Sequence, residues 1–146
     1  MNLNFILKSV VIIAVLMCFQ DLNAQSIIGK YYINKIIGRN LNDSDEFILT
    51  EIKPNEKKEY VYGNIITFNE DYSFTCTYFA PCGNDCFPSS DGTFELITNN
   101  KIKLLVKGYS QEGDCESKLI KLNFNLGIYC ISTESENTIK FIKQNK

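Results

Sequence analysis

Short runs in which apolar and polar residues alternate recur along this 146-residue chain, and turn-forming residues separate one run from the next. A period of two places every second side chain on one face of a β-strand. The clearest runs are Tyr60–Phe68 and Tyr72–Phe79, which the turn residues Asn69–Asp71 join into a hairpin. No stretch of the sequence shows a comparable helical pattern of apolar residues. The alternation therefore predicts an all-β fold.

The same criterion predicts the remaining strands. The first runs from just after Gly29 to about Ile37, and a short strand covers Phe47–Ile52. The later strands follow one another along the second half of the chain: Thr93–Thr98, Lys101–Lys107, Ile120–Leu126, Ile128–Thr133 and Thr138–Ile142. About eight or nine strands joined mostly by short hairpins form a single antiparallel meander, and its closure into a small barrel avoids exposed edges. We therefore expect one all-β barrel domain.

The first 24 residues differ from the rest of the chain. Lys8 is the only charge before the apolar run Val10–Met17, and Leu22–Ala24 then supplies a small residue where a signal peptidase would cut. The apolar run is shorter than the roughly 20 residues that span a bilayer. Residues 1–24 are therefore predicted to be a signal peptide, and residues 25–146 a secreted or periplasmic domain without stable membrane insertion.

Several functional classes lack their usual residues here. The chain contains no histidine, which is the commonest general base and the commonest metal ligand. No nucleophile elbow, P-loop or dinucleotide-binding fingerprint occurs. The net charge is −2, and the lysines are spread along the strands rather than clustered, so no nucleic-acid surface is expected. We expect a monomeric protein that is not an enzyme and has no cofactor or metal.

Five cysteines remain once the signal peptide is removed, and in an exported protein the first expectation is disulfide bonds. In a meander, the predicted loops 80–91 and 108–118 emerge at the same end of the sheet. Cys115 should therefore lie near Cys82 or Cys86. A bridge there would tie the two longest loops together.

The expected bridge to Cys115 leaves three other cysteines to assign. Cys76 is the next candidate partner for whichever of Cys82 and Cys86 is left. Because the total is odd, at least one cysteine stays a free thiol or pairs between chains, and Cys130 is predicted to be that cysteine. A redox or metal site at Cys82–Cys86 is the alternative. It is disfavoured because the spacing is not the C-x-x-C of thioredoxin-like enzymes, and zinc would need further thiolates or a histidine.

Aromatic side chains are abundant, with ten Phe and eight Tyr. Those on the inward face of the strands either fill the barrel as core or line an apolar cavity. Inward tyrosines favour a cavity with polar anchors, because a buried hydroxyl needs a hydrogen-bond partner. The candidate ligand-binding residues are Tyr72, Phe74, Tyr78, Phe94, Leu104 and Phe124.

Two short motifs resemble those of lipocalin-like proteins. Ile28–Tyr31 resembles the G-x-W start of that family, with Tyr31 at the tryptophan position. Ile66–Phe74 resembles a hairpin of small exported lipocalin-like domains of bacteria, with Tyr72 where that hairpin has a glycine. The resemblance implies a barrel that Tyr31 plugs at its closed end and that takes an apolar ligand at its open end.

A second resemblance is to META/HslJ-like domains. Cys82–Asn84, Gly92–Phe94 and Cys115 are similar to the Cys-Asn element, the Gly-x-aromatic element and the later cysteine of that family. This resemblance implies no enzyme role.

Two functions remain in view. The first is an exported lipocalin-like protein that binds a small apolar molecule in its barrel. The alternative is a periplasmic or secreted protein-binding factor, such as an inhibitor or immunity protein, that uses loops 80–91 and 108–118. A deep apolar cavity would favour the first function. A filled barrel would favour the second, with an exposed patch around Phe79, Pro81, Phe87 and Pro88.

Overall fold

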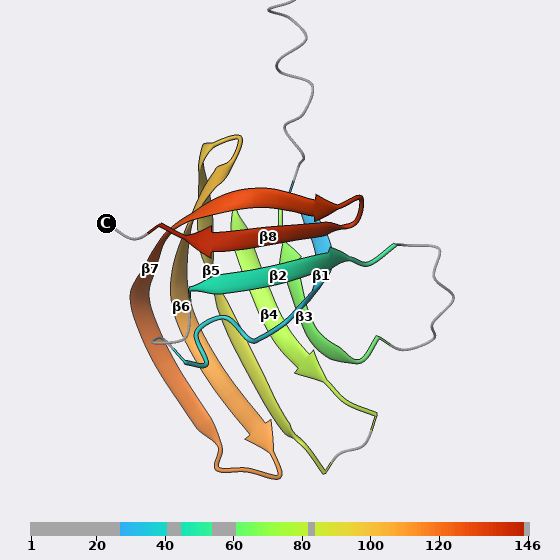
Figure 1. The fold of residues 1–146 in the computed structure, drawn as a ribbon. Coiled ribbons are helices and arrows are strands. Elements are labelled where there is room, and N and C mark those ends of the chain that lie inside the picture. The colour runs from blue at the N-terminus through green and yellow to red at the C-terminus, as the bar shows by residue number, and fades with distance from the viewer. Residues whose placement is uncertain (1–26, 41–44, 54–60, 82–83, 145–146) are drawn as a thin grey trace, which may run out of the picture.

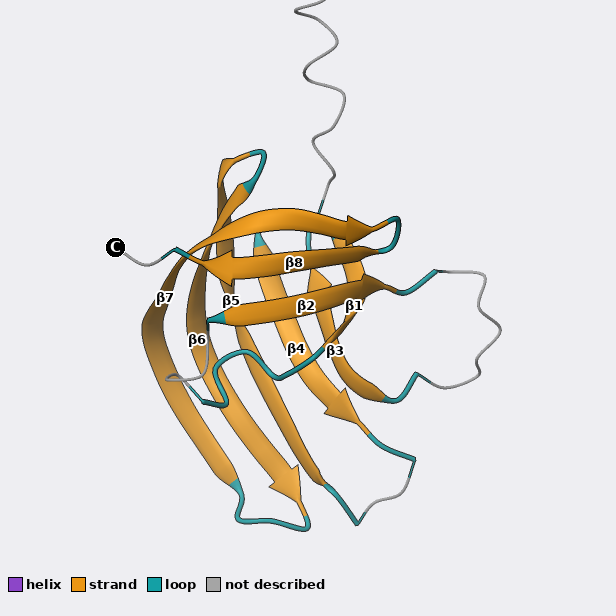
Figure 2. Cartoon of the chain, viewed as in Figure 1, coloured by secondary structure: helices purple, strands orange, loops and turns teal. Residues whose placement is uncertain are grey.

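The computed structural model describes residues 27–40, 45–53, 61–81 and 84–144. These residues form eight β-strands and no helix (Figures 1 and 2). In chain order the strands are β1 (Gly29–Ile33), β2 (Glu46–Glu51), β3 (Gly63–Phe68), β4 (Ser73–Phe79), β5 (Cys86–Thr98), β6 (Lys101–Gly113), β7 (Lys118–Ser135) and β8 (Thr138–Lys143). The all-β prediction is confirmed, whereas the predicted signal peptide lies outside the described residues. No described segment forms a helix with the length and apolarity needed to cross a membrane.

The strands form one closed antiparallel barrel, as the sequence predicted. From β3 to β8 each strand pairs with the next, which makes a meander. The β1–β2 hairpin bridges the two ends of this meander, because β1 pairs with β3 and β2 pairs with β8. Each strand therefore has two hydrogen-bonded neighbours.

The β3–β4 turn shows why this hairpin forms where the alternation placed it. Asn69 N–H donates to the Ser73 carbonyl at 2.9 Å, and the Asp71 carboxylate accepts a hydrogen bond from Ser73 N–H at 3.0 Å. Hydrogen bonding from Ser73 holds the pKa of the Asp71 carboxyl below its usual value. Tyr72 belongs to the turn, with φ 62°, and its side chain is 57% exposed. The prediction that Tyr72 begins the inward row is therefore wrong.

β5 and β6 each contain 13 residues, more than the sequence predicted. They pair along their whole lengths, and the connections on either side shrink to residues 80–85 and 114–117. The prediction of long loops at 80–91 and 108–118 is therefore wrong. These segments are rich in polar residues, but a strand tolerates them because its outer face meets water.

β7 is one strand of 18 residues, although the sequence predicted two strands separated at Gly127. Gly127 has φ 106°, and the β6–β7 register shifts between Leu104 and Leu105, opposite this point. The glycine thus marks a β-bulge within a continuous strand.

β1 ends at Ile33, short of the predicted end at Ile37. Ile36 and Ile37 lie in the β1–β2 loop and are buried in the core. Gly38 has φ 84°, and a Cβ atom there would lie 3.0 Å from Cγ1 of Val106 on β6. Only a residue without a side chain lets the loop approach the inner face of β6 this closely. The β1–β2 loop therefore covers part of the lower end of the barrel (Figure 1).

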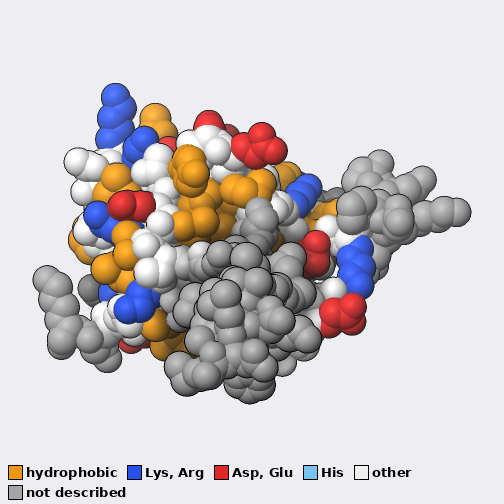
Figure 3. All heavy atoms as spheres, turned by 90° about the horizontal axis from the view of Figure 1, so that it is seen from above, with side chains coloured by type: hydrophobic (Ala, Val, Ile, Leu, Met, Phe, Trp, Pro, Cys, Tyr) orange, Lys and Arg blue, Asp and Glu red, His pale blue; other side chains and the backbone are white. Residues whose placement is uncertain are grey.

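Side chains from all eight strands pack into one core. The ring of Phe68 lies at its centre, with its centroid 5.1 Å from that of Phe94, 6.1 Å from that of Phe141 and 6.2 Å from that of Phe74. We call this region the upper barrel, defined by the buried residues around Phe68. Seen from above in Figure 3, the acidic and basic side chains of the described residues are interspersed around a hydrophobic area.

Candidate functional site

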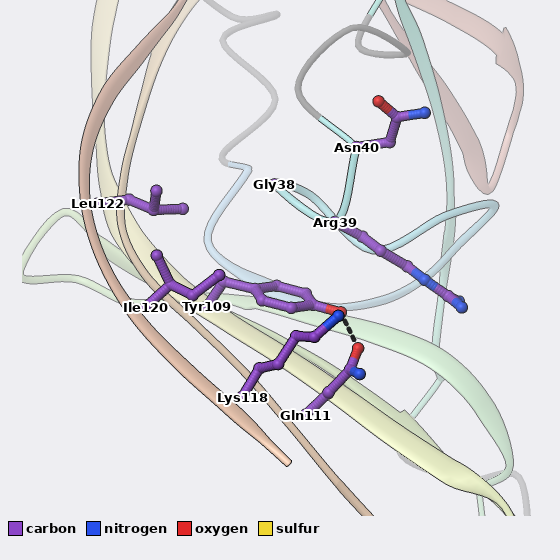
Figure 4. Close-up of a pocket in the computed structure, with 8 residues that line it drawn as sticks. All are labelled: Gly38, Arg39, Asn40, Tyr109, Gln111, Lys118, Ile120 and Leu122. Carbon is purple, nitrogen blue, oxygen red and sulfur yellow. Dashed lines mark hydrogen bonds between the residues drawn. The ribbon is translucent and has the colours of Figure 1, made fainter. Parts of the chain in front are cut away.

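A hollow of about 420 Å³ lies at the lower end of the barrel, between the β1–β2 loop and the inner face of β6 and β7 (Figure 4). We call it the mouth pocket. Three elements supply its lining, which consists of Gly38, Arg39, Asn40, Tyr109, Gln111, Lys118, Ile120 and Leu122.

The β6–β7 register brings the apolar and polar parts of the wall together. Tyr109 pairs with Ile120, and Gln111 pairs with Lys118. Residues opposite each other in an antiparallel pair share one face of the sheet. Leu122 is two residues beyond Ile120 and continues this face. One wall therefore carries an apolar surface that ends in polar groups.

Hydrogen bonds hold the polar rim in place. The Tyr109 hydroxyl donates to Oε1 of Gln111 at 2.9 Å, and Nε2 of Gln111 donates to the Glu116 carbonyl at 2.8 Å. Nζ of Lys118 lies 3.3 Å from Oε2 of Glu116. Both ends of the Gln111 amide are therefore engaged, so its orientation is defined.

The β1–β2 loop supplies the opposite wall. Arg39 N–H donates to the Ile36 carbonyl at 3.4 Å, in a turn whose isoleucines are anchored in the core. Arg39 and Asn40 also line an adjoining hollow of about 390 Å³, together with Asn34, Lys35, Ile36 and Asn64. Arg39 therefore stands at the boundary of two neighbouring hollows.

A disulfide lies next to the rim. Cys86, the first residue of β5, is bonded to Cys115, and the Asp114 N–H donates to the Asp85 carbonyl at 3.0 Å. The prediction that Cys115 pairs with Cys82 or Cys86 is confirmed for Cys86. Because Glu116 follows Cys115 directly, this bond also anchors the segment that orients Gln111.

The remaining cysteines have different positions. Cys130 is a free thiol, as predicted, and accepts a hydrogen bond from Nε2 of Gln144 at 3.1 Å. The prediction of Cys76 as a disulfide partner is wrong, because its side chain points into the core and is a buried free thiol. Burial raises the pKa of Cys76 to about 12, although a hydrogen bond with the Ile37 backbone opposes the shift. Cys82 lies outside the described residues.

The other residues predicted from the sequence as a ligand site are placed in different surroundings. Phe74, Phe94 and Leu104 are buried in the core, as inward residues should be, but none of them lines the mouth pocket. Tyr78 is half-buried and lies against Phe87, with 6.3 Å between ring centroids.

Phe124 was predicted to bind the ligand, and Tyr31 was predicted to plug the barrel. Phe124, which was predicted to face inward, is 40% exposed and does not belong to the core. Tyr31 is buried, and its ring packs edge-on against Phe68 at a centroid distance of 6.3 Å. Burial, together with the charge of Glu51, raises the pKa of the Tyr31 hydroxyl. No mouth-pocket residue was among the ligand-binding candidates, although Ile120 and Leu122 belonged to a predicted alternating strand.

A second hollow, of about 440 Å³, lies along the lower halves of β5, β6 and β7. Its lining includes Asp91, Lys107 and Lys121, and it shares Tyr109, Ile120 and Leu122 with the mouth pocket. All of its described lining residues come from three adjacent strands of one sheet. The mouth pocket differs because a separate loop forms its far wall.

Comparisons with known proteins identify no relative, because no family model, curated protein or solved structure matches the chain. Within the described residues, no three acidic, cysteine or histidine side chains are grouped so that they could hold a metal ion. The mouth pocket combines an apolar wall with hydrogen-bond donors. Such a combination can bind and orient a small molecule.

Proposed function

We propose that the protein is an exported, non-enzymatic, lipocalin-like binding protein that holds a small, partly apolar molecule in the mouth pocket. The observation that carries this proposal is the wall formed by Tyr109, Ile120 and Leu122, which faces the β1–β2 loop across the hollow. Small-molecule sites typically combine such an apolar surface with a few positioned polar groups.

Packing of the upper barrel supports the lower end as the binding position. The rings of Phe68, Phe74 and Phe94 occupy the centre of the barrel. The proposal therefore places the apolar ligand below these rings, with Tyr109 between the core and the hollow.

Export is supported by two independent features. The Met1–Ala24 segment has the composition of a signal peptide. The Cys86–Cys115 disulfide is consistent with an extracytoplasmic location, because disulfides persist mainly in oxidising compartments. On this proposal, the protein recovered outside the cytoplasm begins at or near Gln25, as N-terminal sequencing would show.

The ligand site can be tested with two neighbouring residues of β7. Ile120 lines the mouth pocket and is 44% exposed, whereas Leu119 does not line it and is 84% exposed. Nile red, a neutral apolar dye, should bind the purified protein with one-to-one stoichiometry. Ile120→Asn should weaken this binding about tenfold through lost apolar contact. The matched variant Leu119→Asn should leave it unchanged.

Fluorescence titration measures both affinities, and urea unfolding shows whether each variant is folded. Equal affinities of the two folded variants would place the dye elsewhere, and no saturable binding to the original protein would overturn the proposal.

A second candidate function is protein binding by the disulfide-linked connections. The Cys86–Cys115 bond joins segments 80–85 and 114–117, and Phe79 beside them is 46% exposed. Native mass spectrometry of the protein from its own host distinguishes the two functions. A protein complex that Phe79→Ser dissociates would favour this second function, and a bound small molecule would favour the first.

A further inference from the structure

We infer that the molecule in the mouth pocket carries an anionic headgroup, which Arg39 and Lys118 receive while its apolar part lies against Ile120 and Leu122. The inference rests on the proposed function and adds the charge of the ligand to it. It also assigns an orientation, with the headgroup at Arg39 and Lys118 and the tail towards Ile120 and Leu122.

The charge of the lining is opposite to that of the protein. The whole chain carries a net charge of −2. The described lining of the mouth pocket, in contrast, contains two cations, Arg39 and Lys118, and no acidic residue. A cationic lining raises the local concentration of anions and disfavours cationic ligands.

Arg39 is free to bind a ligand. Within the part of the chain that the structure describes, its guanidinium has no ion-pair or hydrogen-bond partner. A guanidinium offers five N–H donors in a planar fork, which matches the oxygens of a carboxylate or phosphate. In Figure 4 the Arg39 side chain starts at the loop and extends to the side away from Ile120 and Leu122, where it lines both the mouth pocket and the adjoining hollow.

Lys118 can contribute the second positive charge. Its ion pair with Glu116 joins side chains that are 44% and 80% exposed, and such a pair contributes little stability. A ligand anion can therefore compete with the Glu116 carboxylate. In Figure 4 the Lys118 side chain extends towards the hydroxyl of Tyr109, at the polar end of the wall.

The neighbouring hollow, which Arg39 also lines, has a similarly cationic and polar lining. It adds Lys35 and the amide side chains of Asn34 and Asn64 to the surroundings of Arg39, and no acidic residue is among the described residues that line it. Arg39 therefore lines two hollows whose described residues favour anions, which supports Arg39 as the main headgroup residue.

Four ligands with one tail and different headgroups test the inference: octanoate, octyl phosphate, 1-octanol and octylammonium. Their affinities can be measured by displacement of Nile red from the purified protein at low salt. Octanoate should bind about fivefold more tightly than 1-octanol, because charge-assisted hydrogen bonds are stronger than neutral ones. Octylammonium should bind more weakly than 1-octanol. Comparison of octanoate with octyl phosphate shows which anion fits better, and preference for either over 1-octanol supports the inference.

Charge-removing variants identify the residues. Arg39→Gln and Lys118→Gln should each reduce the preference for octanoate, and together they should abolish it, while 1-octanol affinity stays unchanged. Lys101→Gln is the matched control, because Lys101 lies at the other end of β6 and should have no effect.

The outcomes separate the two proposals. Equal binding of octanoate and 1-octanol would overturn the anionic headgroup and leave the proposed function standing. An octanoate preference that survives in the double variant would overturn the assignment of the headgroup to Arg39 and Lys118, and would also leave the proposed function standing. Failure of both Nile red and 1-octanol to bind the original protein would overturn the proposed function, and the headgroup assignment with it.

Discussion

The upper barrel and the mouth pocket share β6 and β7, but the side chains of these strands are buried in the first region and partly exposed in the second. In the upper barrel, Ile102 and Leu104 of β6 and Tyr129 of β7 are fully buried. Lower on the same two strands, Ile120 is nearly half exposed and Gln111 and Lys118 line a hollow. The lower halves of β5, β6 and β7 extend past β2 and β8, and the described part of the β1–β2 loop lies at this level (Figure 1). Alternation decides which face of a strand a residue occupies, but the elements opposite that face decide whether the residue is buried.

Because of this difference, substitutions in the upper barrel should mainly change stability, and substitutions at the mouth pocket should mainly change ligand affinity. The side chains of the upper barrel lose packing when they are truncated, because neighbours surround them on all sides. Side chains at the mouth pocket have solvent on one side, so changes there should alter ligand affinity more than folding.

Truncation at the centre of the upper barrel should have the largest effect. Phe68→Ala should lower the free energy of unfolding by about 3–5 kcal/mol, since the ring contacts at least three others and little can collapse into the space. Urea denaturation measures the change. The control is Phe124→Ala, where the side chain is already 40% exposed and the loss should be much smaller. Equal losses would show that the two regions do not differ as described.

Removal of the disulfide should lower both the stability of the protein and its affinity for the ligand. Cys115→Ser should lower the free energy of unfolding by about 3–4 kcal/mol in the chain-entropy model, because the bond closes a separation of 29 residues. Nile red affinity should fall as well, because the freed segment holds the carbonyl that orients Gln111. Cys130→Ser removes a free thiol and serves as the control. Unchanged dye affinity in folded Cys115→Ser would mean that the disulfide does not support the mouth pocket.

Ser90 lies between the two regions, and its replacement is expected to stabilise the protein by a smaller amount. Ser90 is buried, its register partners are Cys76 and Tyr109, and its hydroxyl has no hydrogen-bond partner among the described residues. Ser90→Ala should therefore raise the free energy of unfolding by about 1 kcal/mol. The adjacent Ser89 hydroxyl lies 3.0 Å from Oγ1 of Thr77, so Ser89→Ala should be neutral or destabilising. Destabilisation by Ser90→Ala would show that its hydroxyl has a partner in solution.

The upper barrel was easier to predict from the sequence than the mouth pocket. Phe74, Phe94 and Leu104 were expected to face inward, and all three are buried. Burial alternates with a period of two in the parts of the strands around these residues, and their turns are short. Local pattern was sufficient there because each strand is enclosed by the others.

The mouth pocket depends on features that a local pattern does not carry. The β6–β7 register shifts between Val106 and Gly108, so Val106 and Tyr109 are both buried although they are three residues apart. This interruption made the end of β6 resemble a loop. Arg39 reaches the hollow only because Gly38 packs against Val106, a contact between residues far apart in the sequence.

A last effect, no larger than that of Ser90→Ala, is expected in the turn at the edge of the upper barrel. Tyr72 adopts φ 62°, which costs most non-glycine residues about 1 kcal/mol, and its ring lies 5.6 Å from that of Phe94. Tyr72→Gly and Tyr72→Ala both delete the ring contact, so their difference reports the backbone alone. We expect Tyr72→Gly to be more stable than Tyr72→Ala by about 1 kcal/mol in urea denaturation, because glycine adopts this conformation without strain. If alanine proved equal to or better than glycine, the turn would have a negative φ in solution, and the aromatic contact with Phe94 would need a different geometry.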